Sequence, residues 1–153
     1  REDLLERCSS RVPDVWNYRS HIERQGMYNT PATYPIYISG LVFRWLQSQG
    51  GVGQMETINT LKAKTLYAAI DNSGGFYHNR VAPAARSKMN VIFTTGNKEL
   101  DELFVQESTT RGLRLLGGYK SMGGMRASIY NAMPLQGVEA LIEFMREFQK
   151  RYG

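Results

Sequence analysis

The last part of the chain carries the clearest helical period in the sequence. Over residues 135–152, apolar side chains recur every three or four positions, and charged side chains fill the opposite face. The apolar positions are Val138, Leu141, Ile142, Met145, Phe148 and Tyr152. A helix with one apolar face buries that face against another element, so this segment predicts a long C-terminal helix packed on a core.

Earlier segments predict further helices and short strands. The spacing of apolar residues predicts helices over residues 33–49, 53–70 and 98–111, and strands over residues 76–79, 87–94, 113–116 and 126–131. After residue 75 the order is strand, helix, strands and helix. This order predicts a compact α/β sandwich with helices against one face of a sheet.

The first half of the chain is expected to be mainly helical. The helix over 33–49 is apolar on most sides and is expected to be largely buried. A stripe along the helix over 53–70 is predicted to face the core; it comprises Met55, Ile58, Leu61, Leu66 and Ala69. Residues 14–30 have no clear period and are expected to be irregular.

The strongest loop signal in the sequence lies between these halves. Residues 71–75 read Asp-Asn-Ser-Gly-Gly, which is typical of a helix stop followed by a loop. We therefore predict two regions, residues 1–71 and 72–153. No internal repeat or low-complexity segment is apparent.

Composition and charge narrow the classes of function. The formal net charge is +5, from nineteen basic and fourteen acidic residues. The basic residues are spread along the chain, and the longest cluster is only Lys150-Arg151, which argues against a nucleic-acid-binding surface. A mildly basic protein is also suited to anionic substrates.

The sequence also argues against a membrane-spanning, a secreted, a disulfide-bonded or a metal-binding protein. No run of about 18 apolar residues is present, so no membrane span is expected, and the first residues do not resemble a secretory leader. Cys8 is the single cysteine, which excludes an internal disulfide and is compatible with a cytoplasmic protein. Together with His21 and His78 it has no metal-ligand spacing, so no metal site is expected.

The segment over residues 117–134 is the most informative about function. Arg126 follows a pair of glycines at the start of a predicted strand. Glycines let a ligand approach the backbone closely, and a guanidinium can bind a carboxylate through two parallel hydrogen bonds. This pattern suits an enzyme that acts on amino or keto acids. A β-turn followed by a strand with one solvated arginine is the alternative.

Residues 123–134, Gly-Gly-Met-Arg-Ala-Ser-Ile-Tyr-Asn-Ala-Met-Pro, resemble the C-terminal signature of the phosphoserine aminotransferases. Further segments resemble the same family in the same order; they begin at Met27, Ser39, Gln49, Ile70, Arg86 and Gln106. The resemblance implies the C-terminal part of a fold-type-I aminotransferase that depends on pyridoxal 5′-phosphate. It implies a small α/β sandwich domain preceded by long helices.

The resemblance also implies roles for particular residues. Arg126 matches the residue that binds the substrate α-carboxylate. Asn29 and Thr30 match a pair that binds the cofactor phosphate across the interface of a homodimer. Tyr119 and Lys120 stand where many members carry His-Arg, which helps bind the distal anionic group of the substrate. This departure lowers the positive charge expected in that part of the pocket.

The lysine that binds the cofactor in this family is expected shortly before Arg1, so no catalytic residue is assigned in this chain. The lysines that are present lie in charged helical or turn contexts; examples are Lys62, Lys64, Lys88 and Lys98. We expect Arg86 and Lys88 to be solvated. An aromatic group is expected to serve core or dimer packing; it comprises Tyr28, Tyr34, Tyr37, Phe43 and Trp45.

The implied reaction interconverts phosphoserine and 2-oxoglutarate with 3-phosphohydroxypyruvate and glutamate. The family also acts on a phosphorylated threonine derivative in pyridoxine synthesis, and the sequence does not separate the two substrates. The chain by itself is expected to be inactive. A non-catalytic α/β ligand-binding or regulatory module remains the alternative, with a nucleic-acid-binding module as a weaker third hypothesis.

Overall fold

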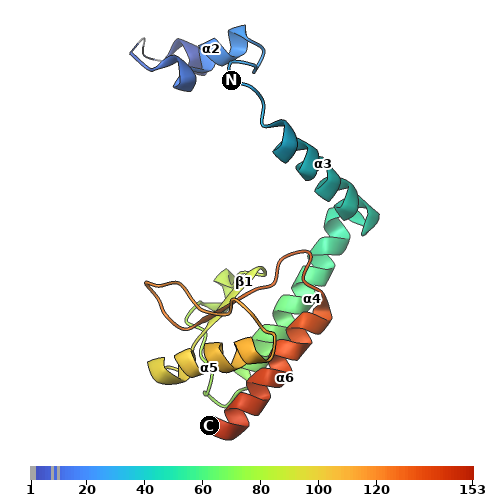
Figure 1. Cartoon of the computed structure of the whole chain (residues 1–153), viewed down its shortest axis with the longest axis vertical. Coiled ribbons are helices and arrows are strands. Elements are labelled where there is room, and N and C mark those ends of the chain that lie inside the picture. Colours follow the sequence, from blue (N-terminus) through green and yellow to red (C-terminus); the bar gives the residue numbers. More distant parts are fainter. Residues whose placement is uncertain (1–2, 8, 10) are drawn as a thin grey trace. The chain divides into compact units, whose positions relative to one another are not determined.

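The computed structural model describes residues 3–7, 9 and 11–153. The chain divides into two units, residues 1–45 and 46–153, and each is described here by itself. Figure 1 shows the helices and strands along the chain. The boundary that the sequence predicts near residue 71 concerns the domains of a longer protein and stays a prediction.

The first unit contains short helices. These are α1 (Asp3–Glu6), the 3-10 helix η1 (Asp14–Trp16) and α2 (Tyr18–Glu23). Asn17 caps α2, because its side chain accepts a hydrogen bond from the Arg19 N–H at 3.0 Å. The expectation that residues 14–30 are irregular was therefore wrong for η1 and α2. Asn17 was the sequence signal that indicates the start of α2, because asparagine is preferred at the N-cap of a helix. Cys8 lies outside the described residues.

Helix α3 (Thr33–Ser48) confirms the predicted helix, but it has no buried residue. Tyr34 is 74% exposed and Phe43 is 63% exposed. The expectation that this helix is largely buried was wrong for this chain. Its aromatic residues do not pack in a core here, and dimer packing, the other role expected for them, stays a prediction. Apolar side chains occur all around α3, and the part of the chain that the structure describes does not cover them.

Helix α4 (Gly51–Asp71) follows directly, after Gly50 at a φ of 96°. The buried residues of α4 are Met55, Asn59, Lys62, Ala63, Leu66, Tyr67 and Ile70. The predicted stripe was only partly correct, since Leu61 is 51% exposed. The buried face is rotated towards Asn59 and Lys62, because both side chains find hydrogen-bond partners inside the fold. The loop predicted after Asp71 is confirmed.

The sheet consists of β1 (Asn90–Phe93) and β2 (Met125–Ser128), which pair antiparallel. Isolated bridges join His78 to Thr94 and Gly117 to Met125. The strand predicted over 76–79 is thus reduced to one bridge. The strand predicted over 113–116 does not form, because Leu115 has a φ of 62° and cannot continue a ladder.

One face of this sheet is buried and the other is partly open. Along β1 and β2, buried and half-buried residues alternate, as expected for a sheet covered on one side. Val91, Phe93, Met125 and Ala127 form the buried face. Asn90, Ile92, Arg126 and Ser128 lie on the other face, which is hereafter called the open face.

Three helices bury the first face. Helices α4 and α6 (Leu135–Tyr152) pack together, and α5 (Lys98–Thr110) completes the cover (Figure 1). Phe104 of α5 lies at the centre of an aromatic cluster and makes edge contacts with Tyr77, Phe93, Phe144 and Phe148. The predicted α/β sandwich with helices against one sheet face is therefore confirmed.

Candidate functional site

A tight loop over residues 117–124 leads into the candidate site. The Gly118 N–H donates to the Gly124 carbonyl at 2.9 Å, and the Gly123 N–H donates to the Tyr119 carbonyl at 2.8 Å. A Cβ on Gly118 would lie 2.1 Å from the Gly123 oxygen, and Gly124 has a φ of 68°. Only glycine fits both positions, so the glycines allow the chain to fold back and place Tyr119 beside β2.

Arg126 lies on the open face, opposite Ile92 of β1. Its guanidinium carbon lies 4.3 Å from the centre of the Tyr119 ring, which is a cation–π contact. Among the described residues, the buried Arg126 Nε has no hydrogen-bond partner. The side chain is thus held by packing and borders a hollow beside Val105, Thr109 and Leu115. A guanidinium in this setting can receive a carboxylate.

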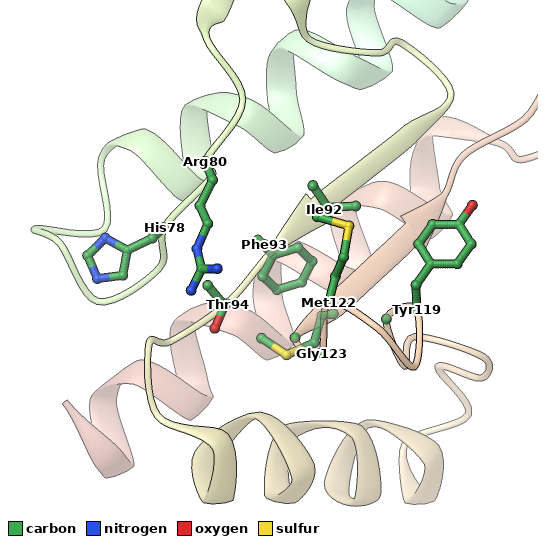
Figure 2. Close-up of a pocket in the computed structure, with 11 residues that line it drawn as sticks. His78, Arg80, Ile92, Phe93, Thr94, Tyr119, Met122 and Gly123 are labelled. Atoms are coloured by element: carbon green, nitrogen blue, oxygen red, sulfur yellow. The ribbon is translucent and has the colours of Figure 1, made fainter.

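Figure 2 shows a neighbouring pocket on the same part of the unit. His78, Arg80 and Tyr119 line it together with Ile92 and Thr94. His78 reaches this position because its backbone exchanges two hydrogen bonds with Thr94, at 2.8 and 3.0 Å. Arg80 is exposed and has no ion pair with any described residue. The pocket therefore places an imidazole and a guanidinium at the end of the sheet that the Tyr119 loop also lines (Figure 2).

His78 and Arg80 were missed in the sequence analysis. The only available signal was the occurrence of two basic residues shortly after the loop at residue 75. That signal is weak, since their place in the pocket that Tyr119 also lines depends on a bridge between segments that are distant in the sequence.

The structure brings together only some of the residues expected from the sequence. Tyr119 contacts Arg126, and Lys120 is exposed in the same loop. Asn29 and Thr30 belong to the first unit, where both are exposed between α2 and α3. The Thr33 hydroxyl donates to the Pro31 carbonyl at 3.3 Å and shapes the end of that turn. The exposed amide and hydroxyl groups of Asn29 and Thr30 are of the kind that binds a phosphate.

Two of the basic residues expected to be solvated are engaged in contacts. Arg86 forms a bidentate pair with Asp71, at 2.6 and 2.8 Å, and lies over the ring of Tyr67; its side chain is 16% exposed. The hydrogen bond from Arg86 lowers the pKa of Asp71. Lys88 pairs with Glu56. The expectation was wrong for Arg86, because its side chain meets Asp71 and Tyr67 of α4 and is mostly covered. Lys88 remains at the surface, with 46% of its side chain exposed.

Lys62 also departs from expectation, because it is fully buried rather than placed on a charged helix surface. Its Nζ contacts main-chain carbonyls in the segment after β2. No group of three or more metal-ligating side chains is found among the described residues. None of the described helices is long and apolar enough to span a membrane.

Comparison with known proteins decides the family. The model of the aminotransferase class-V family matches residues 5–141. The chain belongs to this family.

The curated relatives of this class-V chain include phosphoserine aminotransferases. One from Neisseria meningitidis serogroup A is 70% identical over all 153 residues, and one from Chromobacterium violaceum is 52% identical over the same residues. The match covers 100% of this chain but 42% of each relative. The chain therefore spans less than half the length of these relatives.

Solved structures give the same result for the fold. Phosphoserine aminotransferase from Bacillus circulans subsp. alkalophilus matches with a TM-score of 0.92 and 39% identity, over 100% of this chain and 42% of that one. The pyridoxal-phosphate-bound enzyme from Trichomonas vaginalis matches with a TM-score of 0.84 and 39% identity, over 95% of this chain and 42% of that one. These matches confirm the fold class expected from the sequence.

Proposed function

We propose that this chain is the C-terminal part of a pyridoxal-phosphate-dependent phosphoserine aminotransferase. The observation that carries the proposal is Arg126, held on the open face by Tyr119, in a chain 70% identical to an enzyme of that name. The longer enzyme would interconvert phosphoserine and 2-oxoglutarate with 3-phosphohydroxypyruvate and glutamate. The chain alone would not carry out this reaction.

In this proposal Arg126 binds the α-carboxylate of the amino-acid substrate. Two parallel hydrogen bonds from a planar guanidinium fix the orientation of a carboxylate, and orientation contributes strongly to rate. Tyr119 packs on the guanidinium, and Lys120 supplies positive charge for the distal group of the substrate. Arg80, in the pocket that Tyr119 also lines, is a further candidate for that distal group.

Asn29 and Thr30 would hold the phosphate of pyridoxal 5′-phosphate. Both side chains are exposed and offer hydrogen-bond donors, so they fit a phosphate. When bound, this cofactor supplies an electron sink for the chemistry at the substrate α-carbon. The lysine that binds the cofactor would lie in the part of the enzyme outside this chain.

We further propose a homodimer in which each cofactor site uses residues of both subunits. The exposed apolar residues of α3 support an extensive interface, because apolar surface of this extent is rarely left uncovered. A cytoplasmic location suits such a biosynthetic enzyme. The preference between phosphoserine and the pyridoxine-pathway substrate is left open by the Tyr119-Lys120 pair.

The test is spectroscopic and uses the full-length enzyme loaded with pyridoxal phosphate. Addition of phosphoserine, or separately of glutamate, should convert the aldehyde form of the cofactor to the amine form. The double variant Asn29→Ala plus Thr30→Ala should lose cofactor on dialysis while its circular dichroism stays unchanged. A wild-type enzyme whose spectrum does not respond to either amino acid would favour the non-catalytic ligand-binding module.

A further inference from the structure

Lys62 is a fully buried lysine in the middle of α4, with an exposed fraction of 0%. Lysine is almost never fully buried unless its charge is compensated. The Nζ contacts three main-chain carbonyls: Ile129 at 3.1 Å, Tyr130 at 2.7 Å and Met133 at 2.9 Å. An ammonium has three N–H donors, so each of them has an acceptor. Burial lowers the pKa of Lys62 from its ordinary value.

All three carbonyls belong to one turn, residues 129–133, which links β2 to α6. Asn59 lies one helical turn before Lys62 and donates to the Asn131 side chain at 2.8 Å. The Ile129 N–H donates to the Met89 carbonyl at 2.8 Å and so extends the pairing of the two strands. Helix α4 therefore holds this turn at two adjacent positions, and the turn is continuous with β2.

The two ends of β2 are held by different kinds of contact. Before Met125, backbone hydrogen bonds hold the glycine loop and the strand: the Gly118 N–H donates to the Gly124 carbonyl at 2.9 Å, and the Arg126 N–H donates to the Leu116 carbonyl at 2.7 Å. The end after Ser128 enters the turn bound by Lys62. Charge-assisted hydrogen bonds are shorter and about twice as strong as neutral ones. Lys62 therefore adds charge-assisted contacts after Ser128 to the backbone contacts that hold Arg126 on the other side.

We propose that Lys62 is a positioning residue for Arg126: its ammonium fixes the turn after β2 and thereby sets where the guanidinium meets the substrate carboxylate. This inference rests on the proposed function. An apolar side chain of similar length would fill the same space. It would not hold the three carbonyl groups in one position, and it would leave each of them without a hydrogen-bond donor.

The test compares Lys62→Met, Lys62→Arg and Asn131→Ala in the full-length enzyme. Asp71→Asn is the matched control, because it breaks a contact at the C-terminal end of α4 that joins this helix to Arg86 and not to the turn after β2. We expect kcat/KM for both phosphoserine and glutamate to fall about 10- to 100-fold in Lys62→Met, mainly through KM, with cofactor retention unchanged. We expect Asn131→Ala to lower kcat/KM by less than Lys62→Met does. We expect Lys62→Arg to retain part of the kcat/KM that Lys62→Met loses.

Hydrogen exchange provides a readout that does not depend on activity. Amides of residues 125–134 should exchange faster in Lys62→Met and Asn131→Ala than in wild type, but not in Asp71→Asn. If Lys62→Met does not fold, Asn131→Ala decides the question. Unchanged exchange there would overturn the proposal. The proposal would also be overturned if the amides exchanged faster while kcat/KM stayed unchanged. An equal loss of kcat/KM in the control Asp71→Asn would overturn it as well.

Failure of the proposed function gives a different result. A wild-type enzyme without activity on phosphoserine or glutamate would remove the functional role of Arg126 and, with it, this role of Lys62. The exchange data would then still report whether Lys62 holds β2. If the wild-type enzyme has both activities and Lys62→Met retains them, only the positioning role of Lys62 is overturned.

Discussion

The two faces of the small sheet differ in what they contribute. The buried face carries Val91, Phe93, Met125 and Ala127 and packs on the aromatic cluster around Phe104. The open face carries Arg126 opposite Ile92, beside Tyr119. The same four-residue strands therefore supply the apolar core on one side and the candidate chemistry on the other. Because successive side chains of a strand point to opposite faces of the sheet, residues on one face can be substituted without altering the other face.

The largest effect is expected behind the buried face. Phe104→Ala removes the centre of the aromatic cluster and should lower the free energy of unfolding by about 3–5 kcal/mol. Urea denaturation of this variant and of wild type measures the loss. Arg126→Lys on the open face is the control and should change the free energy of unfolding by less than about 0.5 kcal/mol. Similar losses in both variants would refute the division between the faces.

On the open face, Arg126→Lys should damage substrate handling in the full-length enzyme. Lysine keeps the charge but loses the planar pair of donors, and a hydrogen bond to a charged group contributes about 1.5–3 kcal/mol. We expect kcat/KM to fall about 10- to 100-fold for phosphoserine and for glutamate, because both have an α-carboxylate. If only the phosphoserine half-reaction slows, Arg126 belongs to the distal pocket.

A smaller effect separates the ring of Tyr119 from its hydroxyl group. Tyr119→Leu removes the cation–π contact with Arg126, which contributes about 0.5–2 kcal/mol, so kcat/KM should fall about 2- to 30-fold. Tyr119→Phe keeps the ring and should retain wild-type kcat/KM for glutamate. A loss in Tyr119→Phe as large as that in Tyr119→Leu would instead assign the role to the hydroxyl group.

The smallest effect concerns the partly exposed ion pair of Asp71 and Arg86. The pKa of Asp71 is lowered in the folded state, so this group stabilises the fold above its unfolded pKa of about 3.9, and the stabilisation is lost as the pH falls further. Asp71→Asn should therefore lower Tm slightly at pH 7. The difference in Tm from wild type should shrink as the pH falls from 5 towards 3, a range that brackets about 3.9. A constant difference would contradict the ion-pair explanation.

Local patterns in the sequence predicted much of the fold. The four long helices were expected within a few residues of their observed bounds, because helical hydrogen bonds join residues four apart and the apolar period is local. The glycines before Arg126 indicated a close turn and a strand, and both are present. The resemblance to the aminotransferases also depended on short contiguous segments.

Burial was decided only by the tertiary structure. Lys62 looks like a surface lysine in the sequence, yet its partner Ile129 is 67 residues away. Helix α3 looks like a core helix, yet it is exposed in this chain. Arg80 and Tyr119 share a pocket through a bridge that no local pattern indicates. The sequence by itself determined the four long helices and indicated Arg126 as a candidate to bind an anion. Contacts between distant residues decided which side chains are buried, because burial depends on what packs against a side chain rather than on its own apolarity.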